Sequence, residues 1–231
     1  MKELVRLAKL VKYRIEGRYR PAIQHKCLVD YIGTDYGGYG ICPTALPSEP
    51  IVYSFGIGED ISFDLGLIER YRARVFAFDP TSKAVTWVQA QKLPESFQWF
   101  DYGIGHKDEK ATFYPPENAA HVSYSTLQKQ ENPGAGVSLP VKRFKTIAQA
   151  LGHTTIDVLK LDIEGSEYDV IPDILDSGEI RVNQILIEFH HRFPGVGVEK
   201  TQKAIDQLNN HGYQLFWVTA NGEVYAFIRV E

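Results

Sequence analysis

The sequence predicts an α/β protein: a single three-layer domain on a mostly parallel seven-stranded sheet with an antiparallel terminal hairpin, preceded by an N-terminal helix. Three observations predict it. From residue 51 onward, apolar runs typical of buried strands alternate with amphipathic helical patterns. A Gly-x-Gly turn, Gly56 to Gly58, follows the first such strand. The last two strand-like runs flank Asn221-Gly222, and Asn-Gly between two strands is a strong hairpin signal.

The composition is that of a globular protein. The 231 residues are 44% hydrophobic and 23% charged, which is enough for one full core. The net charge of −4 argues against a nucleic-acid partner, and no apolar run reaches the ~18 residues that span a bilayer. Two cysteines make neither a disulfide framework nor a zinc cluster. We expect a cytoplasmic protein with reduced thiols, and homo-oligomerisation stays open.

Residues 1–50 are expected to form an extension to the main domain, which spans 51–231. The charge pattern of residues 1–17 predicts an amphipathic helix that ends at Gly17. Residues 33–40 are rich in glycine and tyrosine. This segment is either a lid over a ligand or an irregular connection.

From residue 51 the chain alternates strands and helices. Thr81 or Ser82 is a suitable N-cap for one helix, and Gly212 ends another. Pro172 suggests that the helix after Ser166 begins late. The expected strands are 51–55, 74–78, 97–102, 110–114, 137–141, 156–161, 184–189, 213–219 and 223–230. The expected helices are 60–72, 81–91, 143–151 and 198–210, together with the one after Ser166.

Chemically unusual residues stand where the predicted strands end. Parallel strands present their carboxyl ends at one edge of the sheet, and this edge is where α/β proteins of this kind bind ligands. We therefore expect one binding site there. The residues in question are Gly56 and Gly58, Asp79, Asp101, Asp162 with Glu164, and Glu188 with His190.

The glycine turn fits a nucleoside ligand without a pyrophosphate. A dinucleotide fingerprint needs a third glycine, and Ile61 occupies that position. Glu59 and Asp60 put negative charge where a pyrophosphate would bind the helix N-terminus. S-adenosylmethionine carries a ribose and a cationic group instead. Asp79 would accept hydrogen bonds from the ribose hydroxyls, and the reversed last strand also favours a methyltransferase over a dehydrogenase.

Four motifs together resemble the FkbM-type family of class I S-adenosylmethionine-dependent methyltransferases. They are Val52–Asp60, Phe76–Pro80, Val158–Asp169 and Ile187–His190, and the resemblance covers roughly residues 35–230. It implies a Rossmann-like fold and O-methylation of a hydroxyl on a sugar, a glycan or a small natural product. Ser54 departs from the commoner pattern, in which an acid precedes the glycines, and Glu59 is a candidate to supply that carboxylate.

The cofactor residues expected from this resemblance and from the strand ends lie on four segments. They are Ser54, Phe55, Gly56, Gly58, Glu59, Asp60, Phe78, Asp79, Asp101, Tyr102, Gly103 and Asp162. Asp101 could contact the adenine edge, but an acid in a solvated loop explains it nearly as well. Asp79 before Pro80 is also a common turn pair.

Methyl transfer to a hydroxyl requires removal of the hydroxyl proton. The candidate catalytic residues are Asp162, Glu164, Glu188 and His190. The hydroxyl proton is removed either by a positioned base or with the help of a divalent cation that lowers the hydroxyl pKa. By analogy with other class I O-methyltransferases, magnesium or a similar ion would be held by Asp162, Glu188 and His190. The sequence leaves base and metal as alternatives.

Glu164 and Glu167 also fit a purely structural role. Acids at these positions would stabilise a helix N-terminus through its dipole. Two alternative functions are a nicotinamide-dependent oxidoreductase and a non-catalytic relative of the fold that binds a partner through residues 33–40. The sequence does not identify the methyl acceptor.

Overall fold

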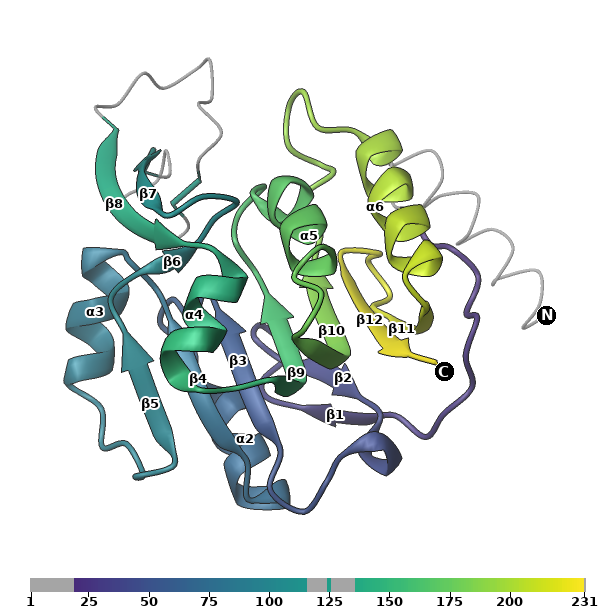
Figure 1. Cartoon of the computed structure of the whole chain (residues 1–231), viewed down its shortest axis with the longest axis horizontal. Helices are drawn as coiled ribbons and strands as arrows, with labels where there is room; N and C mark the ends of the chain where they lie inside the picture. The colour runs from purple at the N-terminus through teal and green to yellow at the C-terminus, as the bar shows by residue number, and fades with distance from the viewer. Residues whose placement is uncertain (1–18, 116–123, 126–135, 231) are drawn as a thin grey trace.

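The computed structural model describes residues 19–115, 124–125 and 136–230 (Figure 1). The helix expected at residues 1–17 lies outside this range. The centre is a seven-stranded sheet with the order β11-β12-β10-β9-β3-β4-β5. Its strands are β3 (Ile51–Phe55), β4 (Arg74–Phe78), β5 (Phe97–Phe100), β9 (Thr155–Leu161), β10 (Arg181–Glu188), β11 (Tyr213–Val218) and β12 (Val224–Arg229).

The sheet confirms the predicted mixed topology. Neighbouring strands from β10 to β5 all pair in parallel, whereas β12 is antiparallel to both β10 and β11. Successive parallel strands are joined by crossovers, so their carboxyl ends meet at one edge. The reversed strand is the second half of the hairpin that Asn221-Gly222 predicts, and Gly222 has the positive φ of 73° that such a turn needs.

Helices cover both faces of the sheet. One hydrophobic core lies under α4 (Phe144–Leu151), α5 (Glu167–Leu175) and α6 (Val198–Asn210), which Figure 1 shows in front of the sheet. The other core lies under α2 (Ser62–Tyr71) and α3 (Ser82–Gln89). Strand side chains alternate between the two cores: Tyr53 and Phe55 face one, and Val52 faces the other. None of the described helices is long and apolar enough to cross a membrane.

The late start expected for α5 is wrong. The helix begins at Glu167 and contains Pro172. Proline removes only one intrahelical donor there, and three buried side chains hold the helix on the sheet: Val170, Ile171 and Ile174.

Residues 30–41 form a small antiparallel hairpin that packs on the second core. It consists of β1 (Asp30–Ile32) and β2 (Tyr39–Ile41). Just after it, the Cys42 N–H donates to Gln184 Oε1 at 2.8 Å, and Gln184 Nε2 donates to the Cys42 carbonyl at 3.0 Å. The hairpin is therefore tied to the sheet by paired hydrogen bonds in the interior.

A second, three-stranded sheet lies beyond the end at which β5 finishes, at the upper left of Figure 1. Its order is β6 (Gly103–Ile104), β8 (Val137–Lys142), β7 (Glu109–Phe113). An isolated bridge joins Tyr114 to Ser125, and the Ser125 hydroxyl donates to the Glu164 carbonyl at 2.5 Å. This contact ties the small sheet to the segment that follows β9.

Candidate active site

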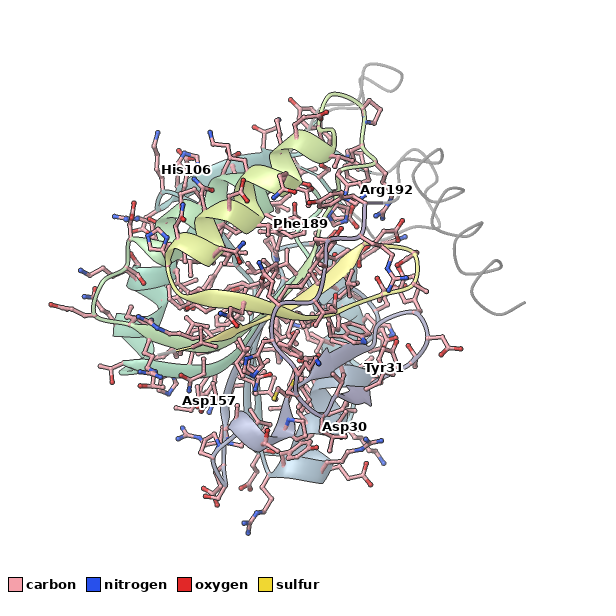
Figure 2. The ribbon with its side chains drawn as sticks, turned by 90° about the vertical axis from the view of Figure 1, so that its right-hand side faces the viewer. Asp30, Tyr31, His106, Asp157, Phe189 and Arg192 are labelled. Atoms are coloured by element: carbon pink, nitrogen blue, oxygen red, sulfur yellow. The ribbon has the colours of Figure 1, made fainter. Side chains whose placement is uncertain are left out.

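A cavity of about 670 Å³ opens at the carboxyl ends of β3, β4, β9 and β10. The β1–β2 loop and the β11–β12 turn complete its wall. Tyr31 and Arg192, both labelled in Figure 2, belong to that wall. The sequence-predicted residues that line it are Phe55, Gly56, Gly58, Glu59, Asp60, Phe78, Asp79, Gly103, Asp162, Glu164 and Glu188.

The loop after β3 is held in a conformation that requires glycine. Gly56 and Gly58 have φ values of 76° and 51°. A Cβ on Gly56 would lie 1.7 Å from the Asp162 carbonyl oxygen. The Gly56 N–H donates to the Phe78 carbonyl at 3.0 Å. The loop backbone therefore contacts the ends of both neighbouring strands.

The Asp79 carboxylate organises this half of the cavity. Its Oδ2 accepts the Gly58 N–H at 3.0 Å, and its Oδ1 accepts the Thr81 N–H at 2.9 Å and the Thr81 hydroxyl at 2.6 Å. Asp79 thus joins the glycine loop to the start of α3. Because a carboxylate has about four acceptor positions, Oδ2 keeps capacity for a further donor such as a ribose hydroxyl.

Lys160, a buried lysine of β9, binds the glycine loop through a backbone carbonyl. Its Nζ donates to the Gly56 carbonyl at 2.7 Å and lies 4.0 Å from Asp162 Oδ2. It also lies 5.2 Å from the centre of the Tyr39 ring. Burial raises the pKa of the nearby Asp64 to about 6, and the charge of Lys160 opposes that rise. Lys160 is therefore a buried cation that binds the loop backbone and faces buried acids.

Acidic groups crowd the ends of β9 and β10. Ligand atoms of Asp162, Glu188 and His190 all lie within 4.8 Å of one another. Glu164 joins them, with Oε2 at 3.4 Å from His190 Nε2. Burial, followed by the charge of Asp162, raises the pKa of Glu188 to about 7. The predicted catalytic residues are thus brought together, and at least three can present atoms to one cation.

A buried glutamate orients His190. Glu167 is fully buried, and its Oε1 lies 2.6 Å from His190 Nδ1. Burial favours the neutral imidazole, but the charges of Glu167, Glu164 and Asp162 outweigh burial and raise the pKa of His190 to about 10. His190 is only 1% exposed, so it lies behind the carboxylates that line the cavity. In the sequence, Glu167 was notable only for its place in the first turn of a helix. Stabilisation of the helix dipole is a simpler explanation for an acid at that place.

Three predicted cofactor residues do not reach the cavity. Ser54 is fully buried within β3, on the opposite side of the strand from Phe55. Asp101 is an exposed turn residue, and Tyr102 lies under Lys142, whose Nζ is 4.0 Å from its ring centre. The strand period of two turns the Ser54 side chain away from the cavity. The turn into β6 does the same for Asp101 and Tyr102.

Asp60 lines the cavity, but its carboxylate is already bound by the protein. Thr34 Oγ1 donates to Oδ2 at 2.7 Å, and the Ser62 N–H donates to Oδ1 at 2.8 Å. Desolvation alone would raise the pKa of Asp60, yet these hydrogen bonds lower it below its ordinary value. Asp60 therefore connects the β1–β2 loop to the start of α2.

Comparison with known proteins gives a family. The model of the methyltransferase FkbM domain matches residues 55–215, which is more than half of the chain. The chain is 25% identical over 199 residues to the AMB antimetabolite synthetase AmbE of Pseudomonas aeruginosa, covering 68% of this chain and 9% of that protein. It is 26% identical over 156 residues to the probable methyltransferase-like protein 24 of Rattus norvegicus, covering 67% and 36%. The chain thus spans well under half the length of these relatives.

Solved structures with a similar arrangement are distant in sequence. The Methanococcus jannaschii fibrillarin pre-rRNA processing protein has a TM-score of 0.48 and 9% identity, covering 79% of this chain and 67% of that one. An Aeropyrum pernix fibrillarin with natively bound S-adenosyl-L-methionine has a TM-score of 0.45 and 10% identity, covering 80% and 68%.

Proposed function

The chain belongs to the methyltransferase FkbM-domain family, whose fold is that of S-adenosylmethionine-dependent methyltransferases, and we propose that it is an O-methyltransferase. The acceptor would be a hydroxyl on a sugar, a glycan or a small natural product. One observation carries the proposal: a glycine loop suited to a nucleoside and a cluster of carboxylates suited to proton removal face the same cavity. Family membership favours methyl transfer over the nicotinamide-dependent alternative.

The cofactor half of the cavity would hold the donor. S-adenosylmethionine supplies a methyl group bound to a positively charged sulfur. The Gly56–Gly58 backbone allows close approach of the ligand, and Asp79 offers an acceptor to its ribose. The negative charges of Glu59 and Asp162 on the wall favour a cationic ligand.

The acceptor half would remove the proton. Glu188 lines the cavity, and its pKa of about 7 allows it to accept a proton near neutral pH. Asp162 lies close enough to raise that pKa. The hydroxyl proton would move to a Glu188 oxygen, and the resulting alkoxide would be the methyl acceptor.

The same residues fit a divalent cation, and we include magnesium or a similar ion in the proposal. Asp162, Glu188 and His190 would hold it, with carboxylate oxygens as hard ligands and His190 Nε2 as a ligand once it has lost its proton. Glu167 on His190 Nδ1 matches the carboxylate that commonly orients a metal-ligating histidine. A bound cation would lower the pKa of the acceptor hydroxyl. Glu188 as a metal-free base is the alternative.

Titration calorimetry with S-adenosylhomocysteine tests the cofactor assignment. We expect binding in the micromolar range, weakened about tenfold or more by Asp79→Ala, because the acceptor for the ribose is lost. Absence of binding at high micromolar ligand would refute the proposal. A non-catalytic relative is refuted if mass spectrometry detects products that gain one methyl group.

Chelation with EDTA distinguishes a metal-assisted mechanism from one in which Glu188 acts as a metal-free base. Activity that falls with EDTA and returns with magnesium supports the cation, and Asp162→Asn should then weaken the response to magnesium. Asp101→Asn is the matched control, because Asp101 is exposed and lies outside the cavity. Activity that survives both EDTA and Asp162→Asn would exclude this site, whereas survival of EDTA alone favours Glu188 as the base.

A further inference from the structure

The β1–β2 loop is hydrogen-bonded to Asp60 and Ser62, which follow the glycine loop. Thr34 donates its N–H to Ser62 Oγ at 3.0 Å and its hydroxyl to Asp60 Oδ2 at 2.7 Å. The Gly37 N–H in turn donates to Thr34 Oγ1 at 3.0 Å. A Cβ on Gly37 would lie 2.7 Å from Asp60 Oδ2, so the contact is tight. The loop therefore presents its side chains from a defined position.

Tyr36 is the side chain that this loop presents to the cavity. It lines the cavity, yet it is 81% exposed, the most exposed large hydrophobic residue in the described part of the chain. Limited desolvation and then the charges of Asp162, Glu164 and Glu188 raise its pKa, so its hydroxyl lies within the field of the catalytic acids. An exposed aromatic face on a cavity wall is a surface for a ligand ring.

Acidic side chains share the cavity wall with Tyr36. Glu164, Glu188 and Glu223 line it, and Asp35 lies on the loop beside Tyr36. Among the described residues of the wall, the two cations already have acidic or carbonyl partners. Lys160 donates to the Gly56 carbonyl, and Arg192 lies 3.3 Å from Glu188 Oε1 and 3.4 Å from Glu223 Oε1. Such a wall repels phosphates and carboxylates but accepts hydrogen bonds from hydroxyl groups.

We infer that Tyr36 and these acids form the acceptor subsite, and that its ligand is an uncharged, polyhydroxylated ring, a neutral sugar, stacked on the tyrosine. The inference rests on the proposed function and narrows it. In the metal-free site, the charge of these acids disfavours phosphorylated and carboxylated sugars, including nucleotide-linked ones; a divalent cation on Asp162, Glu188 and His190 would offset part of that charge. Tyr36 is then a specificity-determining residue that contacts the acceptor.

Ligand-observed NMR with the purified chain tests this subsite. The probes are the methyl glycosides of glucose, galactose, mannose and rhamnose, with methyl glucuronide and glucose 6-phosphate as anionic counterparts, all in EDTA and saturating S-adenosylhomocysteine. We expect at least one neutral glycoside to bind, and the anionic ring to bind about tenfold more weakly or worse. Stronger binding of an anionic ring, or no binding of any neutral glycoside, would overturn the inference.

Variants at Tyr36 separate stacking from hydrogen bonding. Tyr36→Ala should weaken neutral-sugar binding about tenfold, whereas Tyr36→Phe should stay within about threefold, because the ring face is retained. Leu28→Ala is the control, since Leu28 is 72% exposed and does not line the cavity. Unchanged sugar binding by Tyr36→Ala would refute the role of the ring.

Calorimetry with S-adenosylhomocysteine distinguishes the two ways of failing. All three variants should bind it as the unaltered chain does. If the cofactor product binds but neutral sugars do not, the subsite is wrong and the methyltransferase proposal stands. If the cofactor product fails to bind the unaltered chain, the proposed function itself fails.

Discussion

The two halves of the cavity are built by different means. The cofactor half, at the ends of β3 and β4, uses backbone groups and a carboxylate whose contacts are mostly satisfied within the protein. The acceptor half, at the ends of β9 and β10, uses two carboxylates that repel each other, Asp162 and Glu188, beside the imidazole of His190. In the first half, hydrogen bonds within the protein satisfy most polar groups, whereas the second half holds Glu188 where its negative charge is disfavoured.

This difference has a physical consequence. A ligand common to a whole family can be recognised by backbone geometry, which only glycine permits at Gly56. Chemistry instead needs groups whose pKa is shifted. Burying Glu188 beside Asp162 raises the Glu188 pKa at a cost in stability, whereas the surrounding carboxylates stabilise the protonated His190 and so raise its pKa. Substitutions in the two halves should therefore change stability in opposite directions.

The largest effect is expected from Gly56→Ala. The new methyl group would lie 1.7 Å from the Asp162 carbonyl, and the φ of 76° is unfavourable for alanine. Urea unfolding should show a loss of about 3 kcal/mol or more, and S-adenosylhomocysteine binding should disappear. Gly152→Ala is the matched control, because Gly152 has a φ of 72° but a Cβ added there would have no atom within 4 Å. It should lose only about 1 kcal/mol; equal losses would show that close approach is unimportant.

Lys160→Met should come next. The substitution removes the hydrogen bond to the Gly56 carbonyl and leaves Asp64 buried without that positive charge. We expect a loss of about 2–3 kcal/mol and weaker cofactor binding, measured by urea unfolding and calorimetry. Adding Asp64→Asn should restore part of the stability but little of the binding. If the two substitutions add independently, Lys160 and Asp64 do not interact.

Glu188→Gln tests whether the acceptor half costs stability. The folded pKa of about 7 exceeds the ordinary 4.5, so the folded state binds the proton more tightly. The favourable contribution of the protonated acid is present below pH 4.5 and is lost as the pH rises through 7. In EDTA, the variant should match the unaltered chain at pH 4 and be more stable by about 1–2 kcal/mol at pH 8.

Activity of Glu188→Gln should fall about a hundredfold or more, because the residue that accepts the proton is lost. Chemical unfolding at the two pH values and methyl-transfer assays at pH 8 measure both effects. Lower stability at pH 8 would contradict the idea that the carboxylates are crowded at a cost.

The smallest effect is expected at the link between the halves. Thr34→Val keeps the shape but removes the hydroxyl that donates to Asp60 and accepts from Gly37. Stability should fall by about 1 kcal/mol, and the acceptor KM should rise a few-fold with no change in cofactor affinity. Thr86→Val, on the exposed side of α3, is the control and should leave KM unchanged. A change in cofactor affinity would mean that the loop serves the cofactor half.

The fold could be predicted because its signals are local. Each signal is contained in a short stretch of sequence. This holds for the strand and helix periods, for the Gly-x-Gly turn and for Asn221-Gly222. The acids at strand ends were predictable too, since a parallel sheet brings its carboxyl ends together. Which of the predicted residues contact a ligand was harder to predict. Ser54 stands next to Phe55 in sequence, but the strand period of two sends its side chain away from the cavity.

The remaining features depend on contacts between distant residues. Glu167 meets His190 only because α5 packs beside β10, and Thr34 meets Asp60 only because the β1–β2 hairpin folds onto α2. The small sheet pairs β6 with β8 across nearly forty residues of chain, as their Gly103 and Val141 register shows. No local pattern encodes such pairings, so the sequence left open whether residues 33–40 are a lid or a connection and whether Glu167 serves only a helix N-terminus. It predicted neither hydrogen-bond network.

Asp162 belongs to both halves at once. Its carbonyl touches Gly56, whereas its carboxylate belongs to the acid cluster. A shift of one half therefore moves the other with it, so the spacing between donor and acceptor is built into a single residue. For protein engineering this separates what can be varied from what cannot. Under the proposed function, new acceptors are best sought by randomising Tyr36 and Glu223 on the cavity wall, while Asp162 is kept because it contacts both halves.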